Sequence, residues 1–177
     1  MKNKVFLDTC IWMELCVLSN PQDSHEILQN RAATELLGKL LAEKAEIVSL
    51  DYQLIELMQV IMKTKMKECN RYLKANQLSG ISNIKDFREN NNASEYLNQA
   101  LMVCRSAVND IKEITSEIDS YNINDNDIIN ELDKLDVMDS AYYHYCKDNN
   151  VILYTFDKDF DSLEYKNNIK RINLDGK

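Results

Sequence analysis

Short apolar runs alternate with longer amphipathic stretches along this chain. The runs at 4–7 (KVFL), 46–50 (EIVSL), 151–155 (VILYT) and 169–174 (IKRINL) are brief and rich in bulky or β-branched residues, which predicts β-strands. Between them, apolar residues recur every three or four positions, the spacing of helices. Strands separated by helices favour a parallel sheet joined by right-handed crossovers, so we expect an α/β protein with three layers, α/β/α.

The helices are expected in five stretches. The first begins at the D-x-x-E box of Asp23 and Glu26 and reaches about residue 44, with an apolar stripe at Ala33, Leu36, Leu37, Leu40 and Leu41. The others are a long helix over 51–75, one capped by Ser94, a short one over 125–134, and one whose stripe is Met138, Ala141, Tyr142, Tyr145 and Cys146. The polar segment 76–93 is expected to be mostly connector with about one helical turn.

The helix that follows Ser94 carries apolar residues at alternating spacings of four and three, which is a heptad seam. Its positions are Leu97, Leu101, Cys104, Val108, Ile111, Thr115 and Ile118. A seam of this kind needs a helical partner. We favour a hairpin with the helix over 51–75, and the alternative is a seam shared between two chains, which would make a homodimer.

Composition supports one compact unit. A length of 177 residues suits a single domain, here 1–177, and 1 Pro and 3 Gly favour long helices over turn-rich barrels. No apolar stretch approaches the roughly 18 residues of a membrane span, so we expect a soluble cytoplasmic protein that does not bind membranes. The 5 cysteines include no C-x-x-C pair and fit reduced thiols, with Cys10, Cys104 and Cys146 as core residues.

The formal net charge of −8 argues against a general nucleic-acid coat, because such affinity comes from Lys and Arg. One segment, 63–74, is locally basic. On a continued helix, Lys63, Lys67 and Lys74 fall within about 20° of Glu56, which would make a track for phosphates. The alternative is that these lysines solubilise the helix and interact with its dipole.

Three acids, Asp157, Asp159 and Asp161, follow the predicted strand 151–155 at alternate positions. A calcium loop of the EF-hand type would need Gly and Glu where this chain has Ser162 and Asn168, so it is disfavoured. An aspartyl phosphatase of the haloacid dehalogenase type would need a further sheet downstream, yet only 16 residues follow Asp161. The partners of these acids must therefore lie upstream.

Other acids are expected at the same edge of the sheet. Asp8 ends the first predicted strand, and the carboxyl ends of neighbouring parallel strands share a crevice, which would bring Asp8 beside Asp157. Glu56 follows the second strand, although periodicity alone would leave it solvated. Asp139 lies in the first turn of its helix, where Asp136 is the expected N-cap and a simple dipole role competes. Converging carboxylates repel one another unless a divalent cation such as Mg²⁺ or Mn²⁺ neutralises them.

Four segments, VFLDTCIWMEL, LIELMQVI, MDSAYYHYC and LYTFDKDF, resemble in order and context the four acidic motifs of PIN-domain nucleases. The resemblance covers about 4–62 and 136–174 and implies a PIN-like fold. By it, the metal-site and catalytic acids would be Asp8, Glu56, Asp139 and Asp157, with Asp159 as an accessory metal-site acid and Thr9 or Thr155 as a supporting hydroxyl. Asp161 has no counterpart and is expected to be solvated.

PIN domains imply metal-dependent cleavage of single-stranded RNA, and the small bacterial VapC-like members are toxins paired with an antitoxin protein. This chain differs by its long region 63–135, which we expect to be a helical insertion. The competing hypothesis is a catalytically silent PIN-like module that binds a partner through the heptad helix.

Aromatic and histidine side chains are candidates of lower weight. Tyr142, Tyr143 and Tyr145 could stack on bases, but the helical stripe makes Tyr142 and Tyr145 core residues. His25 and His144 lie at no metal-ligand spacing and are given no catalytic role.

Overall fold

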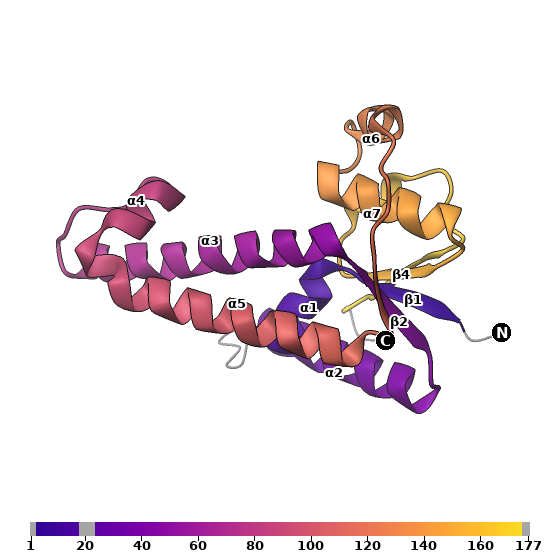
Figure 1. Ribbon diagram of the computed structural model, residues 1–177, viewed down its shortest axis with the longest axis horizontal. Coiled ribbons are helices and arrows are strands. Elements are labelled where there is room, and N and C mark those ends of the chain that lie inside the picture. The colour runs from indigo at the N-terminus through magenta and orange to yellow at the C-terminus, as the bar shows by residue number, and fades with distance from the viewer. Residues whose placement is uncertain (1–2, 18–23, 175–177) are drawn as a thin grey trace.

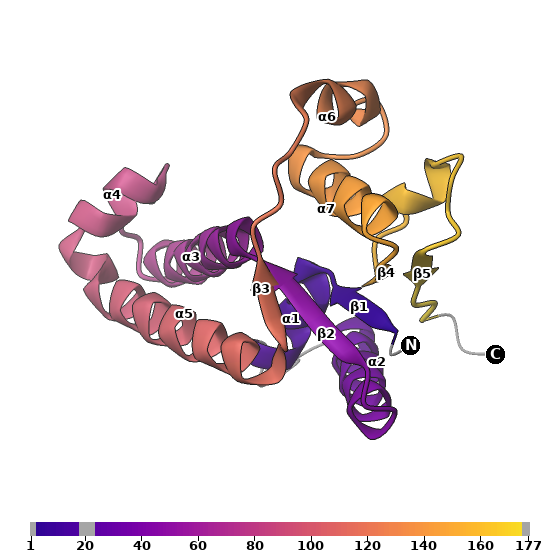
Figure 2. The same cartoon turned by 45° about the vertical axis from the view of Figure 1, so that its right-hand side comes forward.

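The computed structural model describes residues 3–17 and 24–174. It is an α/β protein whose 5 strands are all parallel, in the order β3-β2-β1-β4-β5, with helices on both faces of the sheet (Figure 1, Figure 2). The strands are β1 (Lys4–Leu7), β2 (Glu46–Leu50), β3 (Glu117–Asp119), β4 (Ile152–Thr155) and β5 (Ile169–Arg171). The expected three-layer parallel architecture is confirmed.

The described helices vary widely in length. They are α1 (Thr9–Cys16), α2 (Ser24–Ala42), α3 (Asp51–Ala75), α4 (Ile84–Glu89), α5 (Ser94–Ile114), α6 (Asp125–Glu131) and α7 (Val137–Asp148), with 3-10 turns η1 (Asn91–Ala93) and η2 (Asp159–Ser162). None of them is long and apolar enough to cross a bilayer.

Alternation along β1 divides the interior into two cores. Val5 and Leu7 face α1, α2, α3 and α5, whereas Phe6 faces α7 on the other side of the sheet. The first core contains the fully buried Trp12, and the second contains Tyr142 and further side chains from α7 and η2. Buried apolar surface on both faces is what holds an all-parallel sheet between helical layers.

The order of the strands places a topological switch point between β1 and β4. From β1 the chain builds β2 and then β3 on one side, and it returns to build β4 and β5 on the other. The residue after β1 is tied to β4, because the backbone N–H of Asp8 donates to the carbonyl of Tyr154 at 3.0 Å. In open α/β sheets, ligands bind at the carboxyl ends of the strands at such a point.

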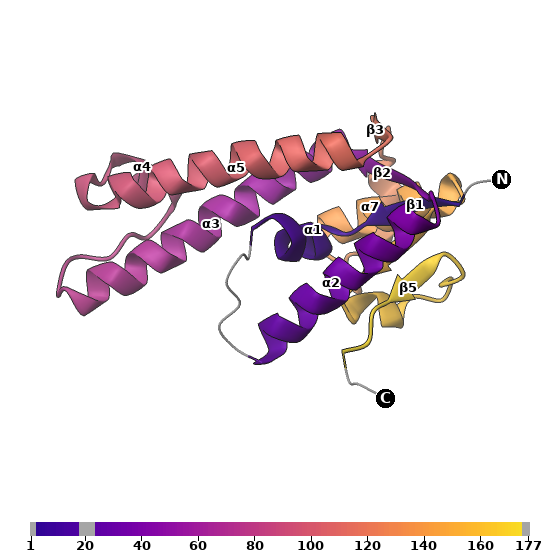
Figure 3. The same ribbon diagram turned by 90° about the horizontal axis from the view of Figure 1, so that it is seen from below.

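Helices α3 and α5 lie side by side as a long hairpin that projects from the sheet, with α4 near its tip (Figure 1, Figure 3). The internal partner that we favoured for the helix after Ser94 is therefore confirmed. A small separate core made of Cys69, Leu73, Ile81, Phe87 and Ala93 closes the tip.

The predicted heptad seam is only partly correct. Helix α5 ends at Ile114, so Thr115 lies beyond it, and Ile118 belongs to β3, where it pairs with Ser49 of β2. Leu101 is 43% exposed. The residues of α5 that are buried are Ala100, Cys104, Ala107 and Ile111. Small alanines at this contact let the two helices approach closely, which a heptad of large residues would prevent.

Helix α1 and strand β3 were not predicted. Helix α1 starts directly after β1 and has only 8 residues, nearly all apolar, so it shows no clear amphipathic period. Strand β3 has only 3 residues, two of them acidic, and it exists because its backbone pairs with β2. The region 63–135 consequently contributes a strand to the central sheet as well as helices.

Several boundaries also differ from expectation. The polar segment 76–93 holds both α4 and η1, capped by the side chains of Asn83 and Asn90. Ser94 is the first residue of α5 rather than a cap. The expected start at Asp23 lies outside the described residues, and α2 carries Glu26 in its first turn.

The later elements are shorter than predicted, since α6 ends at Glu131 and β5 at Arg171. All 5 cysteines are free thiols, with Cys104 and Cys146 buried and Cys10 partly buried.

Candidate functional site

Asp8 lies at the switch point and is only 4% exposed. It occupies the N-cap position of α1, but its side chain makes no capping bond. Its Oδ2 instead accepts hydrogen bonds from Thr155 Oγ1 at 2.5 Å and from Cys10 Sγ at 3.2 Å. Burial raises the pKa of Asp8 to about 6, and the charge of Glu56 adds to this rise, while the hydrogen bonds oppose it.

Glu56 points inward from the second turn of α3. Periodicity alone predicted a solvated side chain, yet its Oε2 accepts hydrogen bonds from Thr9 Oγ1 and from Tyr142 OH, both at 2.5 Å. These donors come from α1 and α7, so Glu56 joins helices on opposite sides of the sheet. Thr9 donates a hydrogen bond to Glu56, and Thr155 donates one to Asp8. Both of the hydroxyls that were predicted as alternatives therefore contact an acid of the site.

Tyr142 belongs to the site, although the apolar stripe of its helix predicted a core residue. It is fully buried, its ring packs 4.9 Å from that of Phe6, and it stacks on Tyr52 at 5.9 Å. Burial and the charge of Glu56 raise the pKa of Tyr142, which keeps its hydroxyl protonated as a donor. One signal was present: Tyr142 stands three positions after Asp139, and such pairs share a helix face.

The matched pair Tyr142→Phe and Tyr52→Phe tests this contact. Tyr142→Phe removes a donor to Glu56 and is expected to lower the free energy of unfolding by about 1 kcal/mol. Tyr52→Phe is expected to be neutral or stabilising, because the Tyr52 hydroxyl is buried without a partner among the described residues. Urea melts of both variants measure the difference, and equal losses would contradict the proposed contact.

Asp139 completes the group from α7. Its backbone N–H donates to Asp136 Oδ1 at 2.9 Å, which confirms Asp136 as the N-cap. Burial, together with the charges of Asp8, Asp136, Asp157 and Glu56, raises the pKa of Asp139 to about 8. The other three acids proposed from the sequence thus lie close enough to Asp139 to disfavour its charge.

Asp157 enters the group from the end of β4. Its backbone N–H donates to Thr155 Oγ1 at 2.9 Å, and its Oδ1 accepts the backbone N–H of Asp159 at 2.8 Å. The side chain of Asp159 is exposed at the start of η2. Asp161 is ion-paired with Arg171 at 2.9 Å, so the expectation of simple solvation was incomplete.

The donor set fits a hard divalent cation in its chemistry. The side-chain donors to Asp8 both reach Oδ2, and those to Glu56 both reach Oε2. The second oxygen of each carboxylate has no side-chain donor in the described part of the chain. Carboxylate oxygens in this state suit Mg²⁺ or Mn²⁺.

The distances between these side chains limit their ability to share one metal ion. Within residues 3–17 and 24–174, no three His, Cys, Asp or Glu side chains are grouped closely enough to hold a metal ion. A shared ion therefore requires the carboxylates to draw together, and their mutual repulsion opposes this movement while no cation is bound.

The remaining candidates lie away from this group. Lys63, Lys67 and Lys74 are exposed on α3, and the last of them is about 27 Å along the helix from Glu56 at 1.5 Å per residue. Their contact with RNA stays a prediction.

The aromatic and histidine candidates of α7 are core residues. Tyr143 and Tyr145 are buried, so Tyr143 is as inaccessible for base stacking as Tyr145. His144 is also buried and packs against the ring of Tyr143 at 5.0 Å.

Comparisons of this chain with protein-family models, with curated proteins and with solved structures found no match. The resemblance to PIN-domain nucleases therefore rests on the four motifs, and the argument for a site rests on its geometry.

Proposed function

We propose that this protein is an endoribonuclease that requires Mg²⁺ or Mn²⁺ and cleaves single-stranded RNA. One observation carries the proposal: Asp8, Glu56, Asp139 and Asp157 come from four different segments and lie near one another at the topological switch point. Burial and neighbouring acids raise the pKa values of Asp8 and Asp139, which is costly to a fold, so the convergence of these acids favours a functional role.

Asp8, Glu56, Asp139 and Asp157 would hold the cation in this proposal. A bound divalent ion would activate a water and stabilise the leaving oxygen of a phosphodiester. The hydroxyls of Thr155, Thr9 and Tyr142 fix the orientation of Asp8 and Glu56, so two of the four carboxylates are positioned before any ligand arrives. Asp139, which no described side chain constrains, is the acid best able to adjust.

Two features support RNA as the substrate: the resemblance of the four motifs and the local positive charge on α3. Phosphates approaching an acidic protein need local cations, and the exposed Lys63, Lys67 and Lys74 lie on the helix that carries Glu56. The resemblance further suggests a toxin role, in which case a small reading frame encoding an antitoxin would adjoin the gene.

The competing hypothesis of a silent binding module is weakened by the fold. That module was to bind its partner through the seam of α5, but the buried face of α5 is already occupied by α3. A silent protein would also gain nothing from four mutually repelling acids.

Cleavage by the purified full-length protein tests the proposal. End-labelled single-stranded RNA is expected to be cut with Mn²⁺ or Mg²⁺ and to remain intact with EDTA. Single-stranded DNA and duplex RNA of the same sequence serve as controls and are expected to be cut more slowly. Equal cleavage with and without EDTA, or no cleavage of any strand with either ion, would overturn the proposal.

A further inference from the structure

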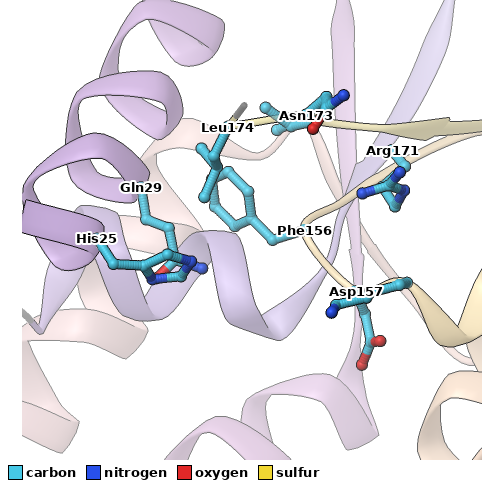
Figure 4. A pocket seen from close by; sticks show the side chains of 9 residues that line it. His25, Gln29, Phe156, Asp157, Arg171, Asn173 and Leu174 are labelled. Carbon is cyan, nitrogen blue, oxygen red and sulfur yellow. The ribbon is translucent and has the colours of Figure 1, made fainter. Parts of the chain in front are cut away.

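A pocket of about 350 Å³ is lined in part by Asp157. It is formed by the start of α2, the loop after β4 and the chain after β5, at the carboxyl edge of the sheet. Figure 4 shows the ring of Phe156 directed toward His25 and Gln29, while the carboxylate of Asp157 points away from them. Asp157 therefore lines the pocket and is also one of the four candidate metal-binding acids.

The lining combines three kinds of side chain. Phe156 and Leu174 provide an apolar surface, and Phe156 is partly buried against the first core, which holds its ring in place. Gln29 contributes an amide, with donors and an acceptor in one plane. Lys158 and Arg171 bring two positive charges to this part of a protein whose formal net charge is −8, beside the carboxylate of Asp157, which also lines the pocket.

This combination matches the chemistry of a nucleotide. Bases stack on aromatic rings and contact amides through their edges, whereas phosphates attract Lys and Arg. Arg171 uses Nε to bind Asp161, so its ion pair fixes the guanidinium beside the pocket, and Lys158 is exposed at the rim. The volume falls within the range of about 300–1,000 Å³ that is usual for small-molecule sites.

We propose that this pocket binds the base of the nucleotide adjacent to the scissile phosphate, an inference that rests on the proposed function and deepens it. Stacking on Phe156 anchors the base, and Gln29 reads its edge. Lys158 and Arg171 hold the phosphate that leads from this nucleotide toward Asp157. The enzyme is then selective for the identity of one base at the cleavage position.

Two variants test base stacking on Phe156 and recognition of the base edge by Gln29 separately. Gln29→Ala is expected to reduce the base preference at the cleavage position, scored by sequencing the products of a randomised single-stranded RNA. Phe156→Leu keeps the apolar volume and removes the stacking ring. It is expected to weaken binding of RNA tetranucleotides about tenfold, because a leucine side chain cannot stack on a base.

Binding is measured in EDTA, so that it does not depend on cleavage. Lys158→Gln is expected to weaken tetranucleotide binding and reduce its dependence on salt, whereas Lys39→Gln, an exposed lysine on α2 outside the pocket, serves as the matched control. Urea melts confirm that each variant is folded.

The two proposals fail in different ways. A parent protein that cuts with Mn²⁺ but shows no base preference, or a preference that Gln29→Ala leaves unchanged, would overturn the pocket and leave the nuclease standing. A parent protein that never cuts RNA would overturn the nuclease proposal. The binding measurements would then still test the pocket, because a tetranucleotide affinity that is unaffected by Phe156→Leu and Lys158→Gln would overturn the pocket proposal as well.

Discussion

Asp8→Asn and Asp157→Asn are each expected to lower the rate of RNA cleavage by about 100-fold or more, the usual size of effect when one preorganised charged group is removed from a catalytic site. Each substitution keeps the shape of the side chain. The amide oxygen of Asn can still accept the hydrogen bonds of Thr155 and Cys10, so the local fold is retained. What disappears is the negative charge that would bind a cation.

The control for these variants is Asp133→Asn, which removes an exposed acid outside the group. It is expected to cleave RNA at the rate of the parent. Initial rates at saturating Mn²⁺, with urea melts of each protein, make the comparison. If Asp8→Asn and Asp157→Asn cleave as fast as Asp133→Asn, the four-acid mechanism is wrong.

Asp139→Asn is expected to stabilise the metal-free protein, in contrast to most substitutions of partly buried residues. The carboxylate of Asp139 has a pKa of about 8 because burial and its acidic neighbours disfavour its charge. One pKa unit corresponds to about 1.4 kcal/mol, and after allowance for relaxation we expect a gain of about 1–3 kcal/mol at pH 8. Were Asp139 only a dipole partner of α7, Asn would cost about 0.3–1 kcal/mol instead.

The dependence on pH has a definite sign. The folded-state pKa values of Asp8 and Asp139, about 6 and about 8, both lie above the ordinary value of 3.8. The folded protein therefore binds more protons than the unfolded chain between about pH 4 and pH 8. The stability of the parent in EDTA should fall as pH rises through this window. Asp139→Asn should flatten the upper half of the fall.

The effect of Mn²⁺ on the melting temperature provides a second test of the shared acid site. A ligand that binds only the folded state at 100 times its Kd stabilises by about 2.7 kcal/mol, which raises the melting temperature of a protein of this size by about 5–10 °C. We expect this shift for the parent in Mn²⁺ and a much smaller one for Asp8→Asn. A parent whose melting ignores millimolar Mn²⁺ at pH 8 would rule out a shared metal site.

These two results describe one property of the site. The acids that would make the protein active are the same acids that make it less stable without a cation. This is an example of the trade-off between stability and activity.

Sequence patterns were sufficient where the signal is local. The apolar runs located β1, β2 and β4, and the alternation of strands with helices predicted the parallel sheet. Placing Asp8 and Asp157 at strand ends then followed from the geometry of parallel strands alone, because every carboxyl end lies at the same edge. Asp136 was identified as a cap from its position before the helix, and its two bonds to backbone N–H groups confirm it.

The tertiary structure decided what depends on contacts between distant segments. The period of its own helix predicted a solvated Glu56, and only the approach of Tyr142, 86 residues away, makes it a partly buried acceptor. Strand β3 has no apolar signal and forms because β2 offers it backbone partners. The pKa of Asp139 and the pocket around Phe156 likewise arise from packing between elements, and periodicity within one element carries no information about which residues the fold will bring beside it.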